Sequence, residues 1–408
     1  MSSYSSAEDA YDSDEPPELA LDLAKLVDRA SEVLKVKCTG AKKLTQGSSH
    51  EIFTLHFQRS PAAPESLVRA GFSCIAQFTR GNSDTAKSVS EIATARYLKR
   101  FTEIPVPEIY YYDLDPDNDI GAPFVLMERM PGRHLHKIWD TLSLETKKSA
   151  LSQIASVIVQ LASLKFDQIG SLDEHGVGPL ISPCFEQPKG PFLSTGAHLR
   201  SFVCPHSVSP PELRNLLQQT QQEIDRFLAL NAHALYLQPP FCLIHADFDG
   251  QNMLFLEESP DNPSPGLTLT GLIDFEYAHT GPHHFLYEYP IFIQDVHWSK
   301  ELYADNAVLR AHFVRAIYDA LPATASEARS TFIASMNDKS FALSWFRDAF
   351  MMMRCSEETL VGSATFYLQS LKDGTGLAYS GRMDYVPERY SQDGELLPPE
   401  ETVERKET

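Results

Sequence analysis

The chain has 408 residues and a formal net charge of −20, with 43% hydrophobic and 10% aromatic residues. This composition is typical of a globular protein long enough for two or three domains, or for one bilobal enzyme with extra segments. The acidic balance argues against a nucleic-acid partner; it is compatible with a cationic substrate, although an acidic surface usually only favours solubility.

The N-terminus carries neither a secretory signal nor an arginine-rich presequence, and no apolar run is long enough to span a bilayer. The six cysteines are scattered and none lies in a Cys-x-x-Cys pair, which indicates reduced thiols. We therefore expect a cytoplasmic protein without a membrane partner, with nuclear entry left open. Residues 1–17 are rich in serine and acid, and we expect them to be disordered.

The next part of the chain predicts a small sheet with two helices. Apolar residues recur at helical spacing from Leu19 to Leu34, and residues 51–57 alternate as a half-buried strand does. A strand at 72–78, a helix at 88–98 and a buried strand that breaks at Pro131-Gly132 follow. From about residue 133 the pattern turns helical; the expected helices cover 146–164, 211–234, 298–321 and 340–353.

Two short apolar strands then deliver acidic and amide side chains at their ends. The first leads into His245-Ala246-Asp247, with Asn252 five residues after the aspartate; the second ends at Asp274, in Ile-Asp-Phe-Glu. A phosphoryl-transfer site has this layout, in which one Asp orients and deprotonates the attacking hydroxyl and an Asn and a second Asp hold magnesium. The sequence thus predicts Asp247 as the catalytic residue and Asn252 and Asp274 as Mg²⁺ ligands. We expect His245 to be structural and to bond the backbone around the loop.

These motifs resemble the aminoglycoside phosphotransferase and choline kinase-like family, in particular its large fungal branch. The resemblance covers roughly residues 38–355 and implies an α+β, bilobal protein kinase-like fold, with a small antiparallel-sheet lobe and a larger, mainly helical lobe. The expected division is a disordered acidic N-terminus at 1–17, a nucleotide-binding N-lobe at 18–130, a catalytic and acceptor-binding C-lobe at 131–384 and a charged, unpacked tail at 385–408.

The resemblance also implies a cation on the 72–78 strand that contacts the nucleotide phosphates and pairs with a Glu of the following helix. Glu91 fits the Glu position. Gln77 stands where the family has Lys or Arg, and Arg80 would point to the other face of a regular strand. Glutamine donates a hydrogen bond to phosphate but brings no charge, so this departure bears directly on nucleotide affinity and turnover.

Two further segments are expected at the nucleotide by the same resemblance. Backbone N–H groups at Gly47 and Ser48 would face phosphate oxygens, although such a turn is often only a hairpin. The backbone from Glu128 to Met130 would bond the adenine edge, and the alternative is an edge strand and turn without a ligand.

The favoured function is transfer of phosphate from Mg-ATP to a hydroxyl of a small molecule, with ATP and Mg²⁺ as cofactors. The alternative is a pseudokinase-like binding or regulatory protein, which Gln77 favours. For Asp249 and Glu276 the sequence allows two roles: each binds the acceptor, or each makes only local contacts. The acceptor pocket would be built by large-lobe helices and by residues 173–210, a long segment rich in Pro, Gly and Ser. Neither the acceptor nor the oligomeric state follows from the sequence.

Overall fold

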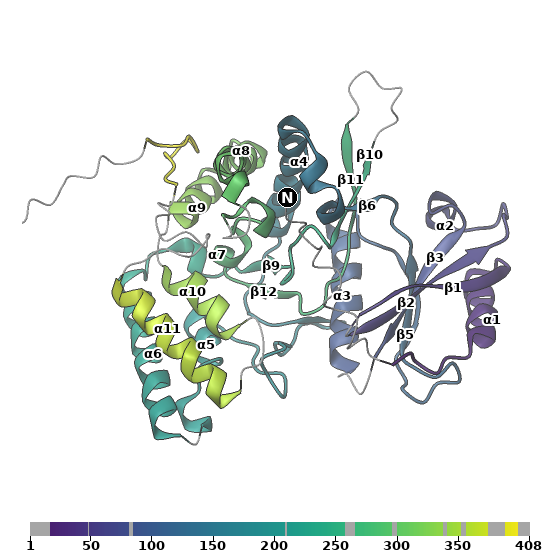
Figure 1. Cartoon of the computed structure of the whole chain (residues 1–408), viewed down its shortest axis with the longest axis horizontal. Helices are drawn as coiled ribbons and strands as arrows, with labels where there is room; N and C mark the ends of the chain where they lie inside the picture. Colours follow the sequence, from purple (N-terminus) through teal and green to yellow (C-terminus); the bar gives the residue numbers. More distant parts are fainter. Residues whose placement is uncertain are drawn as a thin grey trace, which may run out of the picture.

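The computed structural model describes residues 17–47, 49–80, 85–208, 210–257, 266–295, 300–337, 341–351, 356–373 and 388–398. Ser48, one of the expected phosphate-binding residues, lies outside them, as do residues 1–16. Two hydrophobic clusters organise the described chain, one in a sheet-based lobe and one in a helical lobe. Figure 1 shows the two lobes side by side, with the sheet lobe at the right.

Alternating apolar residues form the small lobe, as the sequence predicts. On β2 the side chains of Phe53, Leu55 and Phe57 are buried in the small-lobe cluster, because alternate residues of a strand share one face of the sheet. The five strands are antiparallel in the order β1-β2-β3-β5-β4. Their bounds are β1 Cys38–Gln46, β2 His50–Phe57, β3 Ser73–Thr79, β4 Ile109–Asp113 and β5 Phe124–Glu128.

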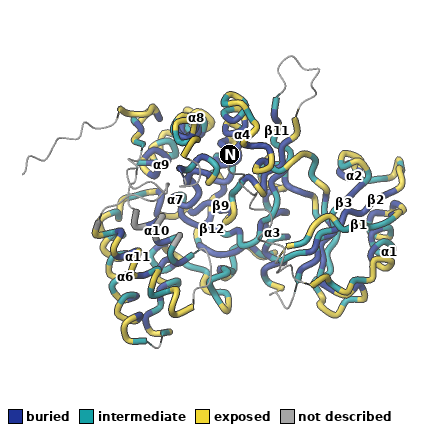
Figure 2. Tube along the Cα trace, in the orientation of Figure 1, coloured by how far each residue is buried: buried dark blue, intermediate teal, exposed yellow. Residues whose placement is uncertain are grey.

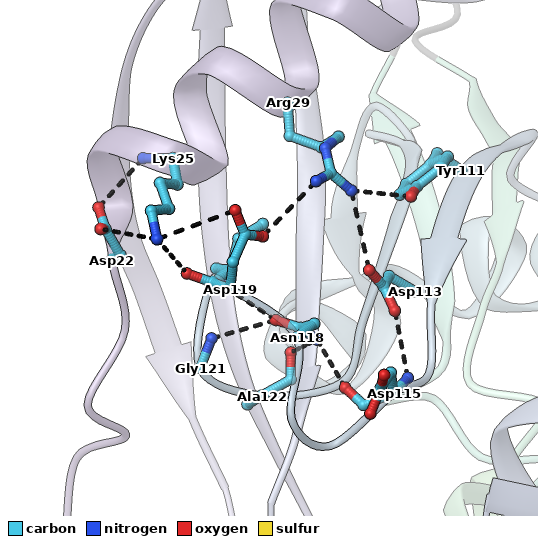
Figure 3. Close-up of polar contacts among 11 residues, drawn as sticks. Asp22, Lys25, Arg29, Tyr111, Asp113, Asp115, Asn118, Asp119, Gly121 and Ala122 are labelled. Atoms are coloured by element: carbon cyan, nitrogen blue, oxygen red, sulfur yellow. Dashed lines mark hydrogen bonds and ion pairs between the residues drawn. The ribbon is translucent and has the colours of Figure 1, made fainter.

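Helix α1 (Leu23–Leu34) buries Leu26, Ala30 and Leu34 against this sheet. Its polar side reaches the loop between β4 and β5, as Figure 3 shows. There Arg29 donates to the Tyr111 hydroxyl at 2.9 Å, and Lys25 donates to the carbonyl oxygen of Asp119 at 3.1 Å. The helix predicted from the spacing of its leucines is thus the outer cover of the small lobe.

Helix α3 (Thr85–Phe101) lies between the small-lobe sheet and the large lobe (Figure 1). It is longer than the predicted helix and begins three residues earlier. Short helix α2 (Glu65–Arg69) precedes β3. The position of α3 matters for the site because its residues can contact both lobes.

The link between the lobes turns sharply at Gly132. This glycine has φ = +111°, and a Cβ there would lie 2.6 Å from the carbonyl oxygen of Phe255. Only glycine adopts this conformation readily and permits this approach. Strand β6 (Arg133–His134) follows and pairs with β10, which brings the linker against the catalytic segment.

Four short strands carry the predicted catalytic motifs. The order of one sheet is β11-β10-β6, and β12 pairs with β9 in another. The bounds are β9 Cys242–Ile244, β10 Met253–Glu257, β11 Leu267–Leu272 and β12 His279–Gly281; a separate hairpin comprises β7 Leu172–Asp173 and β8 Gly176–Val177. All residues of β9 are buried in the large lobe, whereas β10 is buried only in its first three residues (Figure 2).

Helices surround these strands, and α4 packs against α8, β9 and β11. On α4 the predicted stripe of Leu151, Ile154, Val157, Ile158 and Leu161 is buried. The helices are α4 Leu144–Ser163, α5 Thr195–Arg200, α6 Pro211–Leu230, α7 His283–Leu286, α8 Tyr303–Ala320, α9 Ser326–Asn337, α10 Phe341–Phe350 and α11 Glu357–Asp373. None of the helices within the described ranges is long and apolar enough to cross a membrane.

The expectation of an unpacked tail is wrong for residues 388–398. Tyr390 is 2% exposed, and its backbone N–H and C=O both bond the Asn337 side chain, at 2.8 and 2.7 Å. Glu388 accepts a 2.7 Å hydrogen bond from buried Arg310 of α8. The charged composition of this segment gave no sign of packing. The contacts of Tyr390 and Glu388 hold this short segment against the large lobe.

Candidate active site

The loop between β9 and β10 holds Asp247 and Asn252 against each other. The Nδ2 group of Asn252 donates to Oδ2 of Asp247 at 2.8 Å and to its carbonyl oxygen at 3.0 Å. Gln251 Nε2 donates to the same carboxylate oxygen, also at 2.8 Å. Ala246 adopts φ = +70°, a left-handed conformation that is rare outside glycine and often occurs at functional sites. The loop therefore orients the Asp247 carboxylate through two side-chain amides.

His245 has the structural role that the sequence predicts. Its Nε2 lies 3.0 Å from the carbonyl oxygen of Ile273, so this nitrogen carries the proton and donates. Burial lowers the pKa of the His245 imidazole to about 4, and the ring is therefore neutral. The contact ties the catalytic loop to the end of β11, where Asp274 follows.

Asp274 completes the predicted triad. The backbone N–H of Ile273 donates to the carbonyl oxygen of Asn252 at 3.0 Å, which places the two segments side by side. Asp274 itself has φ = +65°. Burial raises the pKa of its carboxyl group, and the nearby Glu276 and Asp247 carboxylates raise it further. The three side chains are thus gathered by the tertiary structure, as their positions at strand ends suggest.

The donor set fits a magnesium ion. The NH₂ group of Asn252 donates to Asp247, so Asn252 would bind a metal through its amide oxygen, with the Asp274 carboxylate as the second protein ligand. Hard oxygen donors of this kind suit Mg²⁺, which usually takes one or two protein ligands and completes its shell with water and phosphate oxygens. No cluster of three or more His, Cys, Asp or Glu side chains suited to a metal occurs within the described chain, so phosphate and water oxygens would have to supply the other ligands.

A cavity of about 350 Å³ lies beside these carboxylates. Asp247, Asp274 and Glu276 line it together with apolar, aromatic and histidine side chains. Part of its wall comes from residues 180–183, His198 and Phe202, within the segment that we expected to shape an acceptor pocket. The other lining residues are Leu180, Ile181, Ser182, Pro183, His198, Phe202, Ala246, Tyr277, His279 and Met351.

On the small-lobe side, Gln77 of β3 contacts Glu91 of α3. Its Nε2 lies 3.3 and 3.4 Å from the two oxygens of that carboxylate. Burial raises the pKa of Glu91 to about 7; nearby His50 opposes this shift, and Asp274 adds to it. A cation at position 77 would lower this pKa.

Glu276 makes two contacts that the sequence did not reveal. Lys87 of α3 donates to its Oε1 at 2.6 Å, and His50 Nε2 lies 3.4 Å from its Oε2, at ion-pair range. Burial works against ionisation of Glu276, but these two partners outweigh it and bring its pKa down to about 2. For His50, burial lowers the pKa, whereas Glu276 and Glu91 raise it and give a net upward shift. A lysine four residues before Glu91 was the available signal, since this spacing shares one helix face.

Other predicted site residues are placed as follows. Asp249 accepts a 2.6 Å hydrogen bond from the Gly250 N–H and does not line the cavity, so its contact is local. The Gly47 N–H donates to the His50 carbonyl oxygen at 2.8 Å, so this N–H already has a partner inside the hairpin turn. A phosphate-binding role at this turn stays a prediction.

The segment from Glu128 to Met130 is predicted to bond adenine through its backbone. The Glu128 carboxylate is buried and accepts a 2.6 Å hydrogen bond from Arg69, and its N–H donates to the Glu108 carbonyl oxygen. The Met130 side chain lies against Gly271, where a Cβ would come within 2.9 Å of it. Adenine contacts from this backbone remain a prediction.

Comparisons with known proteins identify the family of this chain. Residues 73–285, just over half of the chain, match the profile of the "Phosphotransferase enzyme family". A subtelomeric hrmA-associated cluster protein of Aspergillus fumigatus is 28% identical over 137 residues, 33% of this chain and 25% of that protein. The "Altered inheritance of mitochondria protein 9, mitochondrial" of Meyerozyma guilliermondii is 38% identical over 98 residues, 23% of this chain and 16% of that protein. The matches thus span at most about a quarter of these relatives' length.

Among solved structures, the streptomycin–ATP ternary complex of APH(2'')-IIa aligns with 86% of this chain and 97% of its own, at 17% identity and a TM-score of 0.46. A crystal structure of APH(4)-Ia with AMP-PNP and hygromycin B gives 16% identity and a TM-score of 0.47, over 85% and 98% of the two chains. The observed architecture is the expected kinase-like one, an antiparallel five-stranded lobe joined to a helical lobe. From the profile match over residues 73–285, the chain belongs to the phosphotransferase enzyme family.

Proposed function

We propose that the chain transfers the γ-phosphoryl group of Mg-ATP to a hydroxyl group of a small molecule. The observation that carries this proposal is the joint position of Asp247 and Asp274 on the wall of one cavity, with Asn252 bonded to Asp247. Solved relatives named as aminoglycoside phosphotransferases hold ATP or ADP with small-molecule substrates.

In the proposed reaction, Asp247 aligns the acceptor hydroxyl and takes its proton as the oxygen attacks the γ-phosphorus. The new O–P bond forms while the bond to the β-phosphate oxygen breaks, and ADP leaves with the electron pair. Asn252 and Asp274 would hold Mg²⁺, which when bound supplies neutralising charge to the phosphate oxygens. Gln251 and Asn252 hold the Asp247 carboxylate in place, which suits a transition state that needs positioning more than a strong base.

The cavity supports a small acceptor with apolar surface. Leu180, Ile181 and Phe202 contribute apolar walls, and the histidines among the lining residues are buried and have lowered pKa values because of that burial. The carboxylates of the cavity all lie in the catalytic segments, at Asp247, Asp274 and Glu276. An acceptor that presents one hydroxyl to Asp247 and a neutral body to the rest therefore fits better than a polycation.

The experiment is a transfer assay with the purified chain, Mg-ATP and a panel of amino alcohols, sugars, hydroxy acids and aromatic alcohols. Phosphorylated product is followed by ³¹P NMR, and Asp247→Asn defines the background. We expect at least one acceptor to be phosphorylated above it. Nucleotide binding without transfer to any panel member would refute the enzyme function.

A binding or regulatory protein is the second candidate, and the neutral Gln77–Glu91 contact favours it. Thermal shift with and without Mg-ATP, followed by transfer assays on Gln77→Lys, separates the two. A gain in turnover in the variant indicates a kinase limited by the missing cation. Absence of nucleotide binding in both forms indicates a scaffold.

We also propose a cytoplasmic location, for which Cys38, Cys74 and Cys242 give support as buried thiols outside any disulfide. The mitochondrial location in the printed names of some relatives applies to those proteins. Fluorescence microscopy of the tagged full-length chain tests the location, and colocalisation with a mitochondrial marker would contradict it.

A further inference from the structure

Lys87 is a buried cation directed at the catalytic segment. Its side chain is 8% exposed, and its ammonium group donates to Glu276 at 2.6 Å and lies 5.5 Å from the ring centroid of Tyr277. Both partners belong to the segment that follows Asp274, and Glu276 and Tyr277 line the cavity. The lysine thus extends from the small lobe to the edge of the site.

The helix places Lys87 one turn before Glu91, the residue that contacts Gln77. Lys87 and Glu91 are four residues apart on α3 and share one face, about 6 Å apart along the axis. Glu91 contacts Gln77 of β3, and Lys87 contacts Glu276. Adjacent turns of α3 therefore contact two different segments: Glu91 contacts β3, and Lys87 contacts the segment after Asp274.

The side chains around this site include several carboxylates, and Lys87 is a cation that can offset their negative charge. Glu91, Asp274 and Glu276 influence one another electrostatically, and Asp247 acts on Asp274. These carboxylates would repel a polyphosphate, and a nearby cation reduces that repulsion. Gln77 brings no charge, and Arg80 is turned away toward Glu51, at 2.9 Å.

We propose that Lys87 supplies the phosphate-binding positive charge that is missing at Gln77, with Glu276 as the residue that positions its ammonium group. The inference rests on the proposed function, because it requires that ATP bind in this cleft. In the usual arrangement the cation lies on β3 and its carboxylate partner on the following helix. Here the cation comes from α3 and the carboxylate from the catalytic segment, while β3 and Glu91 keep an uncharged hydrogen bond.

A purely structural tie between the lobes is the competing explanation, and binding selectivity distinguishes the two. Isothermal titration calorimetry of the full chain with ATP plus Mg²⁺ and with adenosine separates phosphate contacts from adenine contacts. We expect Lys87→Met to weaken ATP binding at least about tenfold and to leave adenosine binding within about twofold, since loss of one charge-assisted hydrogen bond acts on the phosphates alone. Lys87→Arg should retain most of the ATP affinity.

The decisive variant is the double substitution Lys87→Met with Gln77→Lys. A cation restored on β3 should recover most of the lost ATP affinity, whereas it cannot restore a tie between α3 and Glu276. Arg100→Met, at an exposed position of the same helix, is the matched control for charge loss and should change neither affinity. If Lys87→Met does not fold, Lys87→Gln, which keeps a hydrogen-bonding group beside Glu276, is measured with the same expectation.

Each result has a definite meaning. An unchanged ratio of ATP to adenosine affinity in Lys87→Met, or a loss that Gln77→Lys does not recover, overturns the inference and leaves the proposed function intact. A wild-type chain that binds neither ATP nor adenosine overturns both.

Discussion

The side-chain amide of Asn252 donates to the carboxylate of Asp247 across a loop whose two ends lead into different sheets. This contact orients the Asp247 carboxylate. Asp247→Asn keeps the shape and removes the proton acceptor, so we predict a loss of turnover of about 10²- to 10⁴-fold. Steady-state kinetics with the acceptor found in the transfer assay gives the number.

Nucleotide affinity supplies the control for this variant. Because Asp247 is assigned to the acceptor, calorimetry should show ATP binding within about threefold of the wild-type value. A comparable fall in both turnover and ATP affinity would mean that Asp247 acts mainly on the nucleotide or on the fold.

Asp274→Asn tests the metal site. Asparagine tolerates the left-handed backbone of this position, at φ = +65°, so the fold should persist. We predict that ATP stabilises the wild-type chain more in Mg²⁺ than in EDTA, and that the variant loses this difference. The readout is the unfolding temperature with ATP under each condition. A variant that keeps the Mg²⁺ effect would place the metal elsewhere.

The raised pKa of Glu91 predicts that the free energy of unfolding depends on pH. Burial raises its pKa from 4.5 to about 7, so the folded chain retains a proton that the unfolded chain releases. Its contribution is therefore full below pH 4.5 and is lost as the pH rises through 7. Glu91→Gln cannot ionise and should reduce the fall in unfolding free energy between pH 5 and 8 by about 1–3 kcal/mol.

Urea denaturation at pH 5, 6, 7 and 8 measures this effect. Glu358→Gln, at an exposed position of α11, is the control for loss of one carboxylate. Gln77→Lys should flatten the same profile, since a cation beside Glu91 lowers its pKa. If Glu91→Gln keeps the wild-type slope of unfolding free energy against pH, another titrating group causes the pH dependence.

His198 tests the cavity wall. It is fully buried near Phe192 and Phe202, its ring nitrogens have no hydrogen-bond partner within the described chain, and burial lowers its pKa to about 3. His198→Phe removes two unpartnered polar atoms and should stabilise the chain by about 1 kcal/mol. If the ring bonds the acceptor, as its place on the cavity suggests, KM for the acceptor should rise as well.

Thermal unfolding and acceptor kinetics give the two readouts for His198→Phe. His206→Phe, at an exposed position, is the control and should change neither. A destabilised His198→Phe variant would show that the imidazole makes favourable contacts in the folded chain, for example with buried water.

A stability prediction concerns Arg310, which is 1% exposed and bonds Asp295 and Glu388 at 3.0 and 2.7 Å. Arg310→Ala leaves two acidic side chains without this partner and should lower the unfolding free energy by about 3–5 kcal/mol. Arg226→Ala, which removes an exposed pair with Glu223 on α6, should cost about 1 kcal/mol or less. Urea denaturation compares them, and equal losses would contradict the assigned difference in burial.

The local elements of this protein follow from its sequence. Apolar alternation marks β2, and helical spacing marks α1 and α4, because one buried face selects the period. The spacing of Asp247 and Asn252 within one short loop makes their contact a local property, and strand ends bring Asp274 to the same place. The role of His245 follows for the same reason.

Contacts between distant segments were decided by the tertiary structure. The four-residue spacing puts Lys87 on the same face of α3 as Glu91, but only the docking of α3 beside Glu276, 189 residues away, gives the lysine its buried partner. Glu388 and Tyr390 likewise look like parts of a solvated tail, yet they bury against α8 and Asn337. Charged side chains carry no periodic signal of burial, because their burial depends on a partner that only the assembled fold supplies.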